Sequence, residues 1–186
     1  MARTQNDTQS ATLDDLTVNQ KVATSPLRKF FVASLKDIYY AEFALHEAML
    51  KFEKAATTEE LQEAFENDQF ETQKQIRRLE KVFQIFNEKP AKETCEGIDG
   101  ILKEGDEIIK STPEGSMTRD AALIIAAQKA EHYEIATYGG LVQLALTMGE
   151  RKAAIILEQT LQEEEATDEH LTEIAERFIN FDAEQE

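Results

Sequence analysis

Residues 120–141 read DAALIIAAQKAEHYEIATYGGL, and this stretch decides the fold. Its apolar and small side chains recur in steps of three and four residues, which is typical of a helix that faces a core. These side chains are Ile124, Ala127, Tyr138, Leu141 and, just beyond, Ala145. Glu131 and Glu134 fall on the same stripe. The stretch therefore predicts a long helix that carries two carboxylates on its buried face.

Three further stretches have the same period, so the chain is predicted to contain four long helices. Their approximate bounds are Pro26–Lys54, Thr58–Asn87, Thr118–Thr147 and Glu150–Ile179. Ser25 followed by Pro26 is typical of a helix start. Thr57, three residues before Glu60, predicts a capping box at the second start.

The connections between these helices predict how they are arranged. The joints near Ala55–Thr57 and Met148–Gly149 are short, so each joins an antiparallel hairpin. Between the hairpins, residues 88–117 contain a short helical pattern near Ile98–Ile109 and can traverse the bundle. Two hairpins with one long crossover predict an all-α, ferritin-like four-helix bundle. It is expected to span residues 25–180, after a disordered polar tail at 1–24 and before a C-terminal tail at 181–186.

Composition excludes several classes of function. The formal net charge of −17 argues against a nucleic-acid partner and against an anionic membrane surface, since both need a basic footprint. The single cysteine, Cys95, excludes an internal disulfide and a cysteine-based zinc site. The most apolar stretch, Ala121–Ala127, is too short to span a bilayer, and the N-terminus lacks the apolar run of a signal peptide. We therefore expect a cytoplasmic protein.

Carboxylates interrupt the apolar stripe of every predicted helix near its middle. They are Glu42 in the first helix, Asp68 and Glu71 in the second, Glu131 and Glu134 in the third, and Glu164 and Asp168 in the fourth. Each lies a similar number of residues from its hairpin turn. At about 1.5 Å rise per residue, the four helices are expected to place these groups in one slab across the bundle.

Several buried carboxylates cannot all ionise without a compensating cation, because burying an unpaired charge costs several kcal/mol or shifts its pKa. A pair of divalent ions would meet this need, and oxygen ligands suit Fe and Mn. Pairing with Arg77, Arg78 or Lys129 is the alternative. We expect two transition-metal ions, with Zn as a substitute in a purified sample.

Four segments resemble the ferritin-like family typified by the bacterial proteins YciE and YciF. They are DIYYAEFAL (37–45), EAFENDQFETQKQIRRLEKVF (63–83), residues 120–141 quoted above, and TLQEEEATDEHLTEIAE (160–176). The Glu-x-x-Glu of EHYEIATYG is also similar to the third helix of rubrerythrins, where both glutamates serve a di-iron site. The resemblance implies a cytoplasmic bundle, often a homodimer, that is linked with stress response.

Carried over by position, the resemblance implies that the metal ligands are Glu42, Glu71, Glu131, Glu134, Glu164 and Asp168. Relatives often have His where Asp68 and Gln75 stand here, so the site is poor in nitrogen, which favours manganese or weak occupancy over strong iron–oxygen chemistry. Asp68, His132 and His46 are outer candidates, and His170 is expected at the surface. Tyr39 and Tyr138 are expected to flank the slab.

Three functions stay open at this stage. The first is a redox-active di-metal protein that reacts with oxygen or peroxide during stress. The second is an iron-storage subunit, which needs a closed cage. The third is a non-enzymatic helical stress or interaction protein that keeps the slab as a polar core. The sequence leaves the metal, the substrate and the catalytic residues unassigned.

Overall fold

A computed structural model describes residues 25–186 of the chain. Its long helices are α2 (Pro26–Ala55), α3 (Glu59–Ile85), α5 (Met117–Thr147) and α6 (Arg151–Ile174). The shorter ones are α4 (Glu96–Ser111), the π-helical turn η1 (Ala175–Ile179) and α7 (Asn180–Glu184). No strand occurs among these residues, so the predicted all-helical bundle is confirmed. The expected tail at 1–24 lies outside the described residues.

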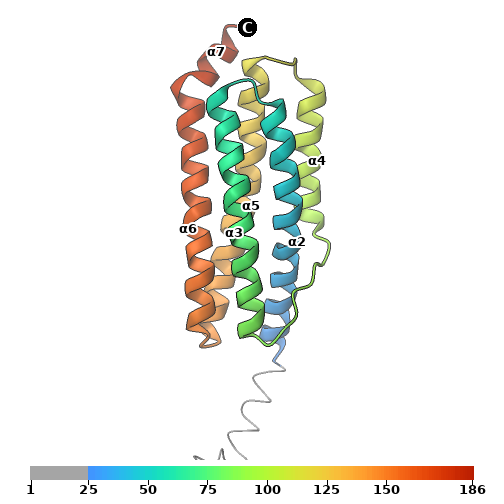
Figure 1. The fold of residues 1–186 in the computed structure, drawn as a ribbon, viewed down its shortest axis with the longest axis vertical. Coiled ribbons are helices and arrows are strands. Elements are labelled where there is room, and N and C mark those ends of the chain that lie inside the picture. Colours follow the sequence, from blue (N-terminus) through green and yellow to red (C-terminus); the bar gives the residue numbers. More distant parts are fainter. Residues whose placement is uncertain (1–24) are drawn as a thin grey trace, which may run out of the picture.

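The two hairpins and the crossover are arranged as predicted (Figure 1). α2 and α6 run in one direction, and α3 and α5 run in the other. The residues after α3 extend along the bundle to α4, which packs against α5 and α2. The turn between α5 and α6 contains Gly149 at φ 79°, a left-handed conformation that glycine adopts readily at a helix end.

The helix starts follow local capping chemistry. Ser25 Oγ accepts a hydrogen bond from the Arg28 amide at 3.2 Å, as predicted. The capping box at Thr57 is wrong by one residue, because Thr58 is the N-cap of α3 and accepts from the Leu61 amide. The Thr57 amide instead donates to Asp120 Oδ1 at 2.7 Å, so a contact distant in sequence decides the cap.

Apolar layers close the bundle above and below its middle. Phe31 stacks on Phe86 with ring centroids 4.4 Å apart near one end, and Phe52 meets Phe65 edge to face at 5.7 Å near the other. α4 packs so closely that a Cβ on Gly105 would lie 2.3 Å from the Phe52 ring. Any polar groups in the middle are therefore shielded from water along the bundle axis.

Candidate metal centre

Three carboxylates from three helices meet in the middle of the bundle. Asp68 of α3, Glu131 of α5 and Glu164 of α6 each offer an oxygen, and these oxygens all lie within 4.8 Å of one another. The Glu131 and Glu164 side chains are each only 1% exposed. The slab expected from helix levels thus brings these three groups together from residues far apart in sequence.

Glu42 supplies the carboxylate of the fourth helix, α2, and is fully buried. The Tyr138 hydroxyl of α5 donates a hydrogen bond to its Oε1 atom. The other oxygen, Oε2, has no hydrogen-bond partner among the described residues. Glu134, one turn from Tyr138 on α5, is also buried. Tyr138 therefore orients Glu42 and leaves one carboxylate oxygen free for a ligand.

A second hydrogen bond orients Glu164. Gln75 of α3 donates from Nε2 to Glu164 Oε1 at 2.5 Å. Glu131 is less well satisfied, because its Oε2 atom is buried without a hydrogen-bond partner within residues 25–186. A buried polar atom without a partner costs free energy unless another group, a water or an ion, satisfies it.

Burial raises the pKa of every carboxyl in this group, because it disfavours the charged form. For Glu42 it raises the pKa to about 8, against the opposing hydrogen bond from Tyr138 and with help from the charge of Asp68. For Asp68, burial and then the charge of Glu71 raise the pKa to about 7. Burial, and next the neighbouring carboxylates, raise the pKa values of Glu131, Glu134 and Glu164 well above 4.5.

Without a cation, these raised pKa values mean that much of the cluster is protonated near neutral pH. A metal ion would reverse this preference, because it binds the ionised form and releases the protons. Oxygen atoms are the only donors in the three-carboxylate cluster, and such donors suit Mg, Ca and Mn better than soft metals. The donor set therefore fits a hard divalent cation.

Glu71, expected at the centre of the slab, lies at its edge. It is half-buried, whereas Asp68 and Thr72 are buried beside it. The buried stripe of α3 steps from Asp68 to Thr72 to Gln75, which turns Glu71 towards the gap between α3 and α6. The expectation that Glu71 is a core residue is wrong, and Asp68 is the α3 carboxylate nearest Glu131 and Glu164.

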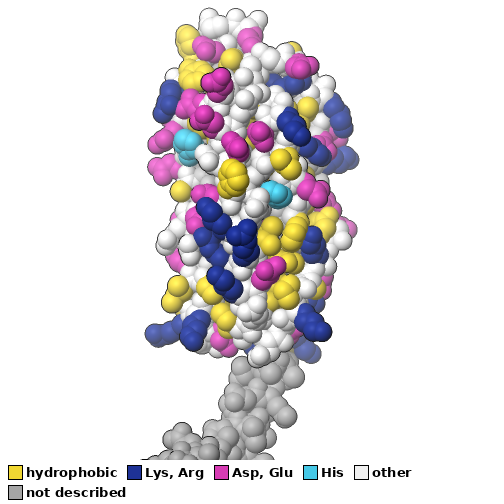
Figure 2. Space-filling view, in the orientation of Figure 1, with side chains coloured by type: hydrophobic (Ala, Val, Ile, Leu, Met, Phe, Trp, Pro, Cys, Tyr) yellow, Lys and Arg dark blue, Asp and Glu magenta, His cyan; other side chains and the backbone are white. Residues whose placement is uncertain are grey.

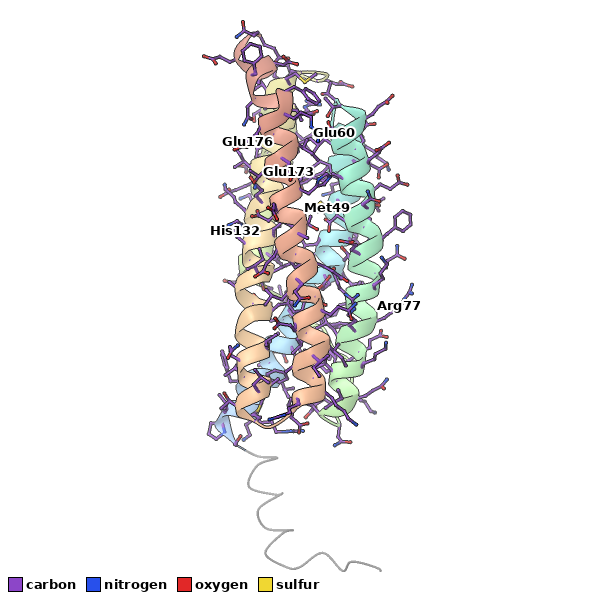
Figure 3. All side chains as sticks on the ribbon, turned by 90° about the vertical axis from the view of Figure 1, so that its left-hand side faces the viewer. Met49, Glu60, Arg77, His132, Glu173 and Glu176 are labelled. Atoms are coloured by element: carbon purple, nitrogen blue, oxygen red, sulfur yellow. The ribbon has the colours of Figure 1, made fainter. Side chains whose placement is uncertain are left out.

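Asp168 and His132 form a contact at the outer edge of the slab. The Asp168 side chain is 22% exposed, and its Oδ1 lies 3.2 Å from His132 Nδ1, too poorly aligned for a hydrogen bond. His132 is 68% exposed and also contacts the Gln128 carbonyl through Nδ1. Figure 3 shows it at the outer edge of α5. His132 therefore lies beside Asp168 at the outer edge of the slab and does not itself reach the core.

The other two histidines differ from each other. His46 is half-buried on α2, one turn after Glu42, and its Nδ1 atom has no hydrogen-bond partner among the described residues. It is therefore the nitrogen donor best shielded from water. His170 is exposed, as expected.

The basic side chains considered as partners do not reach the buried carboxylates. Arg78 binds Glu163, with Nη2 2.7 Å from Oε1, and Lys129 binds Glu104. Arg77 is exposed and points outward from α3 in Figure 3. Among residues 25–186, no ion pair therefore neutralises the slab, although against the effect of burial the charge of Arg78 lowers the pKa of Glu42.

Tyr39 and Cys95 have structural roles. The Tyr39 hydroxyl donates to Glu80 Oε1 at 3.1 Å, away from the cluster. Cys95 is buried and caps α4, because its Sγ accepts a hydrogen bond from the Ile98 amide. Its Sγ lies 3.1 Å from the Tyr133 hydroxyl, which in turn donates to Asp37.

One important residue escaped the sequence analysis. Asp120, at the start of α5, is fully buried and accepts hydrogen bonds from the amides of Thr57 and Thr58. It ties the α2–α3 turn to the second hairpin and so fixes the relative level of the two hairpins. Asp120 lies four residues before Ile124 on the same apolar stripe, and this spacing could have predicted that Asp120 is buried.

Comparisons with known proteins agree with this fold. Residues 26–184 match the family described as Domain of unknown function (DUF892). Protein YciF of Escherichia coli strain K12 is 45% identical over 155 residues, which cover 83% of this chain and 93% of that protein.

Solved structures of relatives superpose over most of the chain. The crystal structure of the E. coli stress protein YciF matches with a TM-score of 0.80 and 42% identity, covering 84% of this chain and 99% of that one. YcfI of Rhodopseudomonas palustris matches with a TM-score of 0.77 and 36% identity, covering 80% and 94%. No helix within residues 25–186 is long and apolar enough to cross a membrane. The family match spans nearly all of the described residues, and the chain therefore belongs to the DUF892 family.

Proposed function

We propose that this chain binds a carboxylate-bridged pair of divalent transition-metal ions, Fe or Mn, in the middle of its bundle and acts in stress response. The observation that carries the proposal is the buried meeting of Asp68, Glu131 and Glu164, with one Glu131 oxygen left without a partner. Glu42, Glu134 and Asp168 complete the ligand set, and half-buried Glu71 contributes from its edge. The role in stress rests on the similarity to the E. coli stress protein YciF.

Bound Fe or Mn would supply one-electron chemistry towards oxygen or peroxide. The chain's own contribution is to bind, orient and shield. Tyr138 holds Glu42 in place and leaves its Oε2 atom free, and Gln75 holds Glu164 in place beside Glu131. The phenylalanine pairs on either side exclude water along the bundle axis. Protons held by the carboxyls leave when an ion binds.

The test is a titration of freshly purified, chelator-treated protein with Fe(II) or Mn(II) under anaerobic conditions. We expect saturation near two ions per chain, with protons released as metal binds. Glu164→Gln should reduce the stoichiometry, while Glu165→Gln, which changes the exposed neighbour, should not. Absence of saturable binding refutes the metal site. An unchanged absorbance spectrum after oxygen is added to the Fe(II)-loaded protein refutes only the redox chemistry.

One observation favours a second candidate, a non-enzymatic helical protein with a polar core. The hydrogen bonds from Tyr138 to Glu42 and from Gln75 to Glu164 partly satisfy the protonated carboxyls without any ion. Under this alternative, Glu164→Gln would stabilise the protein and no metal would raise its melting temperature. Under the metal proposal, the ions raise the melting temperature of the unchanged chain by more than that of the variant.

A further inference from the structure

Each of the four long helices has two neighbours, so the bundle has four side faces through which a solute could reach its middle. The α2–α3 and α5–α6 faces lie within the two hairpins, where the helices pack along their length. The crossover helix α4 packs on both helices of the α2–α5 face and covers part of it, and a smaller groove lies on the rest. The α3–α6 face has no covering element among the described residues.

A groove of about 510 Å³ lies on this uncovered α3–α6 face. Figure 3 looks onto α6 with α3 beside it, and Met49 of α2 lies in the interior behind the gap. Asp68 and Glu71 line the groove from α3, and Glu163, Ala166 and Thr167 line it from α6.

Asp68 connects this groove to the buried cluster. It lines the groove and also contributes an oxygen within 4.8 Å of those of Glu131 and Glu164. Glu71 lies one turn along α3 and is half-buried in the groove. Burial, and next the charge of Glu163, raise its pKa, and a hydrogen bond with Thr167 opposes them. Carboxylates are thus spaced from the surface, through Glu71 and Asp68, to the unpartnered Glu131 oxygen.

The polarity of this groove also differs from that of its neighbours. Lys74 lines the groove and has no ion-pair partner among the described residues. Glu163, the third carboxylate of the groove, is already paired with Arg78. When ionised, Glu71 and Asp68 outnumber Lys74 in the groove, and a surplus of negative charge attracts cations. The groove at the lower end of α5 and α6 is instead lined mostly by apolar side chains, including Leu146 and Ile155. In Figure 2, dark-blue side chains gather in the lower half of the face, and magenta ones predominate above.

We propose that the α3–α6 groove is the route by which divalent cations reach the buried cluster, with Glu71 as the transfer ligand that passes them to Asp68. This inference rests on the proposed metal site and assigns a role to a residue that lies outside the buried cluster. On the opposite face, α4 covers α2 and α5 from the level of Tyr40 and Tyr133 to its end at Ser111, so we expect cations to enter on the α3–α6 side.

The test measures how fast Mn²⁺ binds, using stopped-flow mixing and a fluorescent chelating dye that reports free Mn²⁺. Ala166→Phe places a bulky ring in the groove, and Ala136→Phe makes the same change in the groove between α2 and α5. Both alanines are exposed, so both variants should fold, which circular dichroism would verify. We expect Ala166→Phe to slow binding and release by similar factors of several-fold, with unchanged stoichiometry, and Ala136→Phe to leave both rates unchanged.

A second pair of variants tests Glu71 itself. Glu71→Gln should lower the association rate several-fold and weaken its dependence on ionic strength, because it removes a charge from the groove. Glu66→Gln, which changes an exposed glutamate of the same helix outside the groove, should do neither.

The outcomes separate this inference from the proposed function. Full Mn²⁺ binding with unaltered rates in Ala166→Phe and Glu71→Gln overturns the route and leaves the metal site standing. Slower binding in Ala136→Phe alone moves the route to the α4 side and likewise overturns it. Absence of saturable Mn²⁺ binding in the unchanged protein overturns both proposals.

Discussion

Replacing Glu42 by Gln in the metal-free protein is expected to raise its free energy of unfolding at neutral pH and to leave it nearly unchanged at pH 4. Gln has the shape of a protonated Glu and can still accept the hydrogen bond from Tyr138. The substitution therefore removes the titration of Glu42 while it preserves the packing of the site.

The magnitude follows from the two pKa values of Glu42, which are 4.5 ordinarily and about 8 in the folded chain. The folded state keeps a proton that the unfolded state releases, so stability is lost as the pH rises from the lower value to the higher. pH 7 lies about 2.5 pH units above the ordinary pKa of Glu42. At about 1.4 kcal/mol per pH unit, the ionisation of Glu42 in the unfolded state lowers the free energy of unfolding by about 3 kcal/mol at pH 7.

Urea unfolding followed by circular dichroism between pH 4 and 8, with a chelator present, measures this difference. Glu47→Gln, which changes an exposed residue on the same helix, should show no such pH-dependent gain. If Glu42→Gln and the unchanged protein lose stability in parallel over this range, Glu42 is not held protonated in the folded state and the reasoning is refuted.

Three further changes test the packing around the site by urea unfolding. Gly105→Ala should destabilise the protein by about 1–3 kcal/mol, because the added methyl group meets the Phe52 ring. Gly100→Ala on the same helix has open space around it and should stabilise the protein by up to about 1 kcal/mol. Equal effects of the two substitutions would contradict the close packing of α4. Asp120→Asn should cost about 1–3 kcal/mol, since an amide cannot accept all of the hydrogen bonds from the α2–α3 turn, and an unchanged stability would remove that role. Tyr138→Phe leaves buried Glu42 without its donor and should cost a similar amount, and a neutral result would show that the hydroxyl does not orient the carboxylate.

The helices and their order were predictable because their physical causes are local. Apolar side chains in steps of three and four define the buried stripes, and connection lengths separate hairpins from a crossover. The slab was predictable too, since similar distances from the tight turn between α5 and α6 place Glu131 and Glu164 at one level. Which face of the bundle α4 covers could not be predicted, because the length of the connection shows only that α4 lies somewhere along the bundle.

The details of the site depend on fractions of a helical turn. Positions 71 and 72 follow Asp68 by three and four residues, and either spacing fits the buried stripe of a helix. Only packing against α6 decides that Thr72 is buried and that Glu71 faces the groove. The cap at Thr58 and the role of Asp120 depend on a contact between residues more than sixty positions apart, which no local pattern reports.

A crystal of the protein grown with Mn²⁺ and measured at the manganese absorption edge tests the central claim most directly. Anomalous difference density should show ions in the middle of the bundle, bound by Asp68, Glu131 and Glu164, with Glu42 nearby. The same measurement on Glu164→Gln crystals should show this density weakened or lost. Density confined to surface carboxylates, with none between α3, α5 and α6, would contradict the account.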